Sequence, residues 1–135
     1  IQYIFSGKLI RKLRPKEKLL IDGCHSMVSG KNLSDYLKTV KFPKYGVWSM
    51  MKNKDPSNFI KQFKGVFEKI YTIPINGERN SMSPKVLAKI AKKNNIDVTS
   101  FKSIESVIKK ISSNDKKIIC VFGSLYQCGN ILNKN

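Results

Sequence analysis

Residues 18–26 read Lys-Leu-Leu-Ile-Asp-Gly-Cys-His-Ser, and this stretch decides how the fold is interpreted. A short apolar run, typical of a buried strand, stops on a carboxylate, a glycine and the only histidine of the chain. In open α/β sheets, ligands bind just outside the carboxyl ends of the strands. At such an edge Asp22 can accept a hydrogen bond from a ribose hydroxyl, and His25 can donate or accept one. The stretch therefore predicts a strand that brings polar groups to a ligand site.

Strand-like and helical patterns alternate from Leu19 to the end of the chain. Two of the helical patterns begin at Asp55-Pro56 and Ser83-Pro84, where an N-cap residue precedes a proline. Such alternation implies βαβ crossovers, and hence a mostly parallel sheet with helices on both faces. We therefore expect a three-layer, Rossmann-like α/β fold, with an N-terminal edge strand or a hairpin that turns at Ser6-Gly7.

The individual elements follow from the spacing of the apolar residues. The expected strands are 19–21, 46–50, 70–73, 97–99 and 118–122, the last being the most apolar. Apolar residues at i, i+3, i+4 and i+7 mark the helix faces that we expect to be buried. These residues are Leu33, Tyr36, Leu37 and Val40; Phe59, Ile60, Phe63 and Phe67; Val86, Leu87, Ile90 and Ala91; Ile104, Val107, Ile108 and Ile111; and, on a partly apolar face, Leu125, Tyr126, Cys128, Ile131 and Leu132.

Length and composition restrict the class of protein. A chain of 135 residues fits a single domain, and no apolar run approaches the roughly 20 residues that cross a bilayer. The three cysteines lack C-x-x-C spacing, so we expect reduced thiols in a cytoplasmic protein. Cys24 is interpreted as a small buried residue in a tight turn, the alternative being a nucleophile. Because the chain begins at Ile1 without a methionine or a signal peptide, we expect it to be part of a longer protein.

The positive charge of the chain needs an explanation. There are 26 Lys and Arg residues against 9 Asp and Glu, for a formal net charge of +17. A non-enzymatic module that binds nucleic acid or another polyanion is one interpretation, because clustered cations neutralise phosphates. However, the lysines are spread over every expected helix, and only Arg11, Arg14 and Arg79 offer the guanidinium groups typical of specific contacts. We expect an anionic ligand, no membrane and no nucleic acid, and keep the polyanion module as the alternative.

Polar segments follow four of the expected strands and should meet at one edge of a parallel sheet. Cations, hydroxyls and glycines beside helix N-termini suit a phosphate or carboxylate ligand. The edge lacks a G-x-x-x-x-G-K-[ST] phosphate loop, a G-x-G-x-x-G fingerprint and paired metal ligands, so it is interpreted as half of a site. Its segments are residues 22–25, 52–55, 76–79 and 123–124.

The same segments resemble motifs of the folylpolyglutamate synthase/dihydrofolate synthase family, which is Mur ligase-like. Residues 21–26 resemble its Asp-Gly-Ala-His-Asn segment, with Ser26 where asparagine is usual, and residues 48–55 look like its Gly-Met-x-x-x-Lys-Asp loop. Residues 72–79, with Ser83-Pro84, are similar to a third loop of bacterial members. Residues 122–129 match its Gly-Ser-Leu-Tyr-x-x-Gly motif. The matches occur in order over nearly the whole chain.

The resemblance implies that residues 1–135 form the C-terminal domain of a cytoplasmic carbon–nitrogen ligase of folate biosynthesis and one-carbon metabolism. In that family, ATP phosphorylates the carboxylate of dihydropteroate or folate, and the amine of L-glutamate then forms an amide. The phosphate loop, Mg²⁺ and folate sites belong to an N-terminal ATPase domain that lies outside this chain, so this domain holds no metal and is expected to be inactive alone. The resemblance leaves open whether the intact enzyme performs one or both reactions.

The family motifs also assign roles to six residues. Asp22 and His25 are implied to contact ATP, and His25 is the candidate catalytic residue, facing the phosphate and glutamate region. The residues implied on the glutamate and phosphate side are Ser124, Ser26, Lys54 and Asp55.

Overall fold

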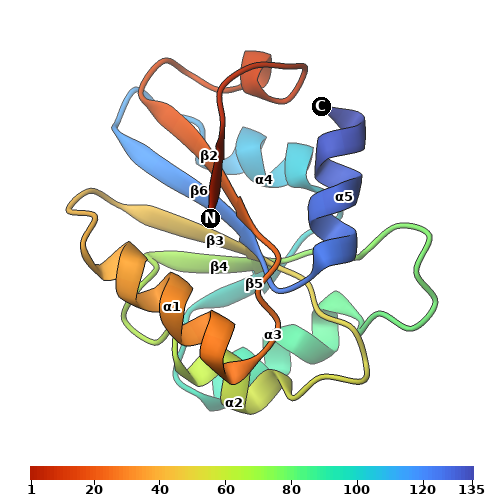
Figure 1. Cartoon of the computed structure of the whole chain (residues 1–135). Coiled ribbons are helices and arrows are strands. Elements are labelled where there is room, and N and C mark those ends of the chain that lie inside the picture. The colour runs from red at the N-terminus through yellow and green to blue at the C-terminus, as the bar shows by residue number, and fades with distance from the viewer.

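Strands β2 (Glu17–Asp22) and β6 (Lys117–Phe122) pair in parallel along their whole length, within one six-stranded sheet. The computed structural model describes residues 1–135 and shows helices on both faces of this sheet (Figure 1). The remaining strands are β1 (Gln2–Ile4), β3 (Lys44–Trp48), β4 (Lys69–Thr72) and β5 (Val98–Ser100). The helices are η1 (Ile10–Lys12), α1 (Met27–Lys38), α2 (Pro56–Lys61), α3 (Pro84–Lys93), α4 (Ile104–Ile111) and α5 (Leu125–Lys134).

The strand order β1-β2-β6-β3-β4-β5 explains which helices cover which face. From β2 to β5 the chain advances in one direction across the sheet, and right-handed crossovers place α1, α2 and α3 on the same face. The chain then returns to insert β6 between β2 and β3, so α4 and α5 cover the opposite face. Figure 1 shows the first three helices below the sheet and α4 and α5 above it. The predicted three-layer, mostly parallel α/β fold is confirmed.

Each face of the sheet has its own hydrophobic core, because successive strand residues point to opposite sides. In β6, Ile118, Cys120 and Phe122 pack with α1–α3, whereas Ile119 and Val121 pack with α4 and α5. All five residues are at most 1% exposed, as expected for a central parallel strand. The predicted strand 118–122 is confirmed, and every residue of β6 is buried.

A polar side chain caps the N-terminus of every α-helix, as the sequence predicted at Asp55 and Ser83. In each case the cap accepts a hydrogen bond from a backbone N–H in the first turn, which satisfies a donor that the helix leaves free. These caps fix where each helix begins after its strand or loop. The N-cap residues are Ser26, Asp55, Ser83, Ser103 and Ser124.

The predicted N-terminal edge strand is confirmed, since β1 pairs antiparallel with β2. The alternative, a hairpin that turns at Ser6-Gly7, is not formed, because residues 8–12 form a turn and η1. Two of the predicted helix faces differ from the structure. On α5, Leu125, Tyr126 and Leu132 are 64%, 55% and 45% exposed. In α3 the buried residues are Leu87, Ala88 and Ala91, while Val86 is 44% exposed. The stripe toward the sheet is narrow, since α3 lies at the periphery near the edge strand β5. No helix combines the length and hydrophobicity that a membrane crossing requires.

Candidate functional site

An open pocket of about 710 Å³ lies at the carboxyl ends of the parallel strands. Three of the four predicted segments contribute to it, through residues that follow β2, β3 and β6. The pocket wall is therefore built by segments far apart in the sequence that the parallel sheet brings to one edge. The lining residues are His25, Met51, Lys52, Asn53, Lys54, Asn80, Gly123, Ser124, Leu125 and Tyr126.

The structure brings His25, Lys54 and Ser124 together around this pocket, as the sequence predicted. Neither Lys52 nor Lys54 forms an ion pair, so both ammonium groups are available to a ligand. They line the same pocket as the N-terminal end of α5, whose free N–H groups and dipole also favour an anion. The pocket thus has the electrostatic character expected for a carboxylate or phosphate group.

The turn from β6 into α5 depends on glycine. Gly123 has a φ of +105°, and a Cβ added there would lie 2.2 Å from the Ser49 carbonyl oxygen. Only glycine fits this conformation at so close a backbone approach. Ser124 follows as the N-cap of α5 and is 2% exposed, with its hydroxyl accepting the Gln127 backbone N–H at 3.3 Å. This geometry fixes Ser124 at the pocket wall.

His25 is oriented by a hydrogen bond to its own turn. Its Nδ1 lies 3.0 Å from the Gly23 carbonyl oxygen, and because a carbonyl only accepts, Nδ1 must hold the proton. In the neutral ring, Nε2 is then the acceptor. His25 lines the pocket, so the neutral form of its imidazole has a lone pair at Nε2, rather than an N–H, for a ligand there.

Asp22, Ser26 and Asp55 do not line the pocket; local hydrogen bonds engage each of them. Asp22 Oδ1 accepts the Cys24 backbone N–H at 2.8 Å. Ser26 and Asp55 cap α1 and α2 by accepting from Ser29 and Asn58. Asp55 is thus the simple helix cap that its Asp-Pro context predicts. The ligand roles that the family motifs imply for these three residues stay predictions.

Cys24 is not a candidate nucleophile. It is 4% exposed, and burial, followed by the nearby Asp22 carboxylate, raises its pKa well above the usual range. Burial also raises the pKa of Cys128, to about 11. The interpretation of Cys24 as a small buried residue in a turn is confirmed, and all three cysteines are free thiols. The chain has no group of three His, Cys, Asp or Glu residues that could hold a metal ion.

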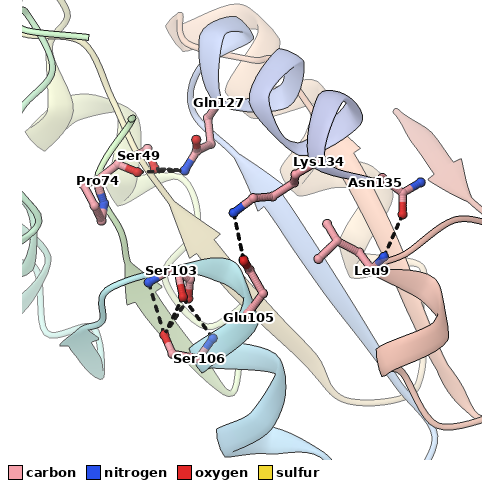
Figure 2. A network of polar contacts seen from close by, with 9 residues as sticks. All are labelled: Leu9, Ser49, Pro74, Ser103, Glu105, Ser106, Gln127, Lys134 and Asn135. Atoms are coloured by element: carbon pink, nitrogen blue, oxygen red, sulfur yellow. Dashed lines mark hydrogen bonds and ion pairs between the residues drawn. The ribbon is translucent and has the colours of Figure 1, made fainter. Parts of the chain in front are cut away.

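Sequence reasoning missed Asn80 and Gln127. Asn80 lines the pocket in place of the predicted residues 76–79, because its carbonyl accepts from Lys52 N–H at 2.7 Å and holds the two loops together. Gln127 reaches from α5 to Ser49 and Pro74, as Figure 2 shows. One signal was available for Gln127: it lies four residues before the buried Ile131, which makes it a polar residue on an apolar helix face.

A family model described as the dihydrofolate synthetase C-terminal domain matches residues 8–134. The chain belongs to this family. The resemblance predicted from the four motifs is therefore confirmed at the level of the family. No curated protein sequence matches the chain.

Solved structures of folylpolyglutamate synthases and of FolC have the same fold as this chain. Escherichia coli FolC in complex with DHPP and ADP aligns with a TM-score of 0.73 at 18% identity, covering 86% of this chain and 28% of that one. Folylpolyglutamate synthase of Mycobacterium tuberculosis complexed with ADP and AMPPCP gives 0.74 at 18%, covering 86% and 29%. The Thermotoga maritima folylpolyglutamate synthase gives 0.74 at 20%, covering 89% and 28%. This chain spans less than a third of the length of each.

Proposed function

We propose that the chain is the C-terminal domain of an ATP-dependent amide ligase that adds L-glutamate to dihydropteroate, folate or both. The membership of the dihydrofolate synthetase C-terminal domain family carries this proposal. In the reaction, a carboxylate oxygen of the pteroate or folate attacks the γ-phosphorus of ATP, and ADP leaves. The glutamate amine then attacks the acyl carbon, phosphate leaves, the amide forms and the amine loses a proton.

The residues at this edge of the sheet suit different parts of the substrates. Lys54 and Ser124, beside the N-terminus of α5, suit the carboxylate of glutamate or the leaving phosphate, since both are anions. His25 offers Nε2 as a hydrogen-bond acceptor for the amine or for the nucleotide. We propose Asp22 as a further nucleotide contact, and Ser26 and Asp55 as supports of the glutamate and phosphate side through the helices that they cap.

An absent partner domain is the second part of the proposal. The chain has no G-x-x-x-x-G-K-[ST] phosphate loop and no cluster of metal ligands. We therefore propose that an N-terminal ATPase domain of the same protein supplies the phosphate loop and the ligands of Mg²⁺. Mg²⁺ would neutralise charge on the ATP phosphates. On this proposal the chain alone is inactive, because the reactants must be held together in a closed cleft.

Exposed apolar residues beside the pocket fit such a partner. Met27 and Val28 in the first turn of α1 are 51% and 74% exposed, and Leu125 and Tyr126 in the first turn of α5 are 64% and 55% exposed. Leu125 packs over Gly23 in the loop between β2 and α1, where an added Cβ would meet its side chain at 2.3 Å. Large apolar side chains gathered at the rim of a polar pocket are typical of an interface, and we assign this rim to the ATPase domain.

The test compares the intact ligase with this chain alone. We expect glutamate- and pteroate-dependent consumption of ATP only in the intact protein. In that protein, His25→Ala and Asp22→Ala should lower kcat/KM by about 100-fold or more, the range for losing a group that acts in proton transfer or charge stabilisation. Lys89→Ala, an exposed lysine on α3 far from the pocket, is the matched control. Full activity in the Asp22 and His25 variants would contradict the site assignment.

A further inference from the structure

Gln127 joins three elements of the carboxyl edge through one buried side chain. It lies in the first turn of α5 and is 4% exposed. Its Nε2 donates to the Ser49 hydroxyl at 3.1 Å and to the Pro74 carbonyl at 3.1 Å. Ser49 follows β3 and Pro74 follows β4, so each of the two amide hydrogens is used on a different strand-end loop, as Figure 2 shows.

The two loops that Gln127 contacts are themselves bonded to each other. Ser49 donates from its hydroxyl to the Ile73 carbonyl at 2.9 Å. Further along the two loops, the Lys52 backbone N–H donates to the Asn80 backbone carbonyl at 2.7 Å, and the Met82 backbone N–H donates to the Met50 backbone carbonyl at 2.8 Å. The loop after β3, which carries Lys52 and Lys54, is therefore held as one unit with the loop after β4.

On its other side, the same residue supports the opposite wall of the pocket. The Gln127 backbone N–H donates to the Ser124 hydroxyl at 3.3 Å, and Ser124 lines the same pocket as Lys54. Gln127 thus contacts both walls directly: Ser124 through its backbone, and the lysine-bearing loop through its side chain. A buried amide group that donates both of its N–H hydrogens has few alternative positions, so it fixes the distance between the groups that it contacts.

We propose that Gln127 is a positioning residue, which sets the spacing between Ser124 and the Lys52–Lys54 loop so that one anionic group can contact both. The group is a carboxylate or a phosphate, which share negative charge and acceptor oxygens. This inference rests on the proposed function for its choice of ligand. Gln127 itself touches no reacting atom in this assignment; it acts through the loop and through Ser124.

Kinetics of the intact ligase provide the first test. Gln127→Leu keeps the side-chain volume roughly constant but removes both donors, and Ser49→Ala removes only one hydroxyl, in case the first variant fails to fold. The control is Asn130→Ala, which deletes a hydrogen bond from the same helix to the Asn76 carbonyl (3.0 Å) but lies outside the pocket. We expect KM to rise about tenfold, the effect of losing a typical net hydrogen bond, while kcat changes less than about twofold.

The substrate whose KM rises identifies the anion. A rise for L-glutamate assigns its carboxylate to the gap, and a rise for ATP assigns a phosphate. Unchanged KM values for both, or the same rise in Asn130→Ala, would overturn the proposal.

Amide hydrogen exchange gives a readout that does not depend on activity. The Lys52 and Met82 amides bridge the two loops, so loosening of these loops should speed their exchange. We expect about tenfold faster exchange at both amides in Gln127→Leu. In Asn130→Ala we expect no increase in the exchange rate of either amide. If the intact protein shows no glutamate-dependent activity, the proposed function fails while this measurement still decides the positioning role. Unchanged exchange at Lys52 and Met82 would reject that role whatever the activity.

Discussion

The amino and carboxyl edges of the parallel sheet hold charged groups in different environments. At the amino end, Glu17 and Lys117 stand opposite each other in the sheet and form a buried ion pair of 2.8 Å, with both side chains at most 4% exposed. At the carboxyl end, Lys52 and Lys54 stand around an open pocket without an ion pair. The sheet therefore has one edge at which opposite charges pair with each other and one edge at which two lysine charges form no ion pair.

The amino-end pair is saturated with hydrogen bonds. Lys117 Nζ donates to Glu17, to the Ile111 carbonyl and to the Ser113 hydroxyl, which uses all three of its hydrogens. Glu17 also accepts the backbone N–H groups of Arg14 at 2.9 Å and Ser113 at 3.0 Å. Such a cluster leaves no capacity for a ligand and ties β2 and β6 to the loop before β6. The amino edge is closed by its own hydrogen bonds, whereas two lysines without an ion pair line the open pocket at the carboxyl edge.

The largest expected effect is at the amino end, on removal of one partner of the buried pair. Lys117→Met should lower the free energy of unfolding by about 3–5 kcal/mol, because Glu17 is left charged and without its cation in the protein interior. Chemical denaturation measures this. The double variant Glu17→Leu with Lys117→Met should recover much of the loss, since no unpaired charge remains. If the double variant were as unstable as Lys117→Met alone, the loss of stability would come from side-chain packing and not from an unpaired charge.

The next effect tests the glycine on which the carboxyl edge depends. Gly123→Ala should destabilise the fold by about 1–3 kcal/mol, because a Cβ cannot occupy the space beside the Ser49 carbonyl at this φ. Gly129→Ala is the matched control: Gly129 lies inside α5 with nothing within 4 Å of an added Cβ. There, alanine should stabilise by about 0.5–1 kcal/mol. Equal changes of the melting temperature in the two variants would contradict the interpretation that the turn at Gly123 requires glycine.

A smaller effect at the amino end should appear as a function of pH. Burial alone would raise the pKa of Glu17, but hydrogen bonds from Arg14, Lys117 and Ser113 outweigh it and hold the pKa below its usual range. The stability from Glu17 is therefore complete above the unfolded pKa of about 4.3 and is lost as pH falls through the lower, folded value. Urea unfolding between pH 6 and pH 3 should show this fall.

Glu17→Gln should remove that part of the pH dependence. Glu105→Gln, which breaks a half-exposed pair with Lys134, should leave most of it in place. An unchanged acid profile in Glu17→Gln would show that another carboxylate controls the acid transition.

The contrast between the edges also explains what the sequence could and could not predict. Strand 118–122 and the cap at Asp55 were predictable because each is written in neighbouring residues, as an apolar run and as an Asp-Pro pair. His25, Lys54 and Ser124 could be placed in one site because parallel strands share a carboxyl edge. The Glu17–Lys117 pair spans 100 residues and leaves no local pattern. The same is true of the bonds from Gln127, which depend on how α5 packs against two loops.

The smallest effect on stability is expected where the effect on binding is greatest. Lys52→Ala and Lys54→Ala should each change the free energy of unfolding by less than about 0.5 kcal/mol, because neither lysine has a partner to lose. In the intact ligase, each should raise KM for the anionic substrate about tenfold or more, as expected for a hydrogen bond from a charged donor. Added salt should narrow the difference from the wild type, since it screens exposed charges. Lys89→Ala should change neither quantity. If Lys52→Ala and Lys54→Ala instead destabilised the fold as much as Lys117→Met, the two pocket lysines would have a structural role. That outcome would contradict the proposal that the pocket is the binding site.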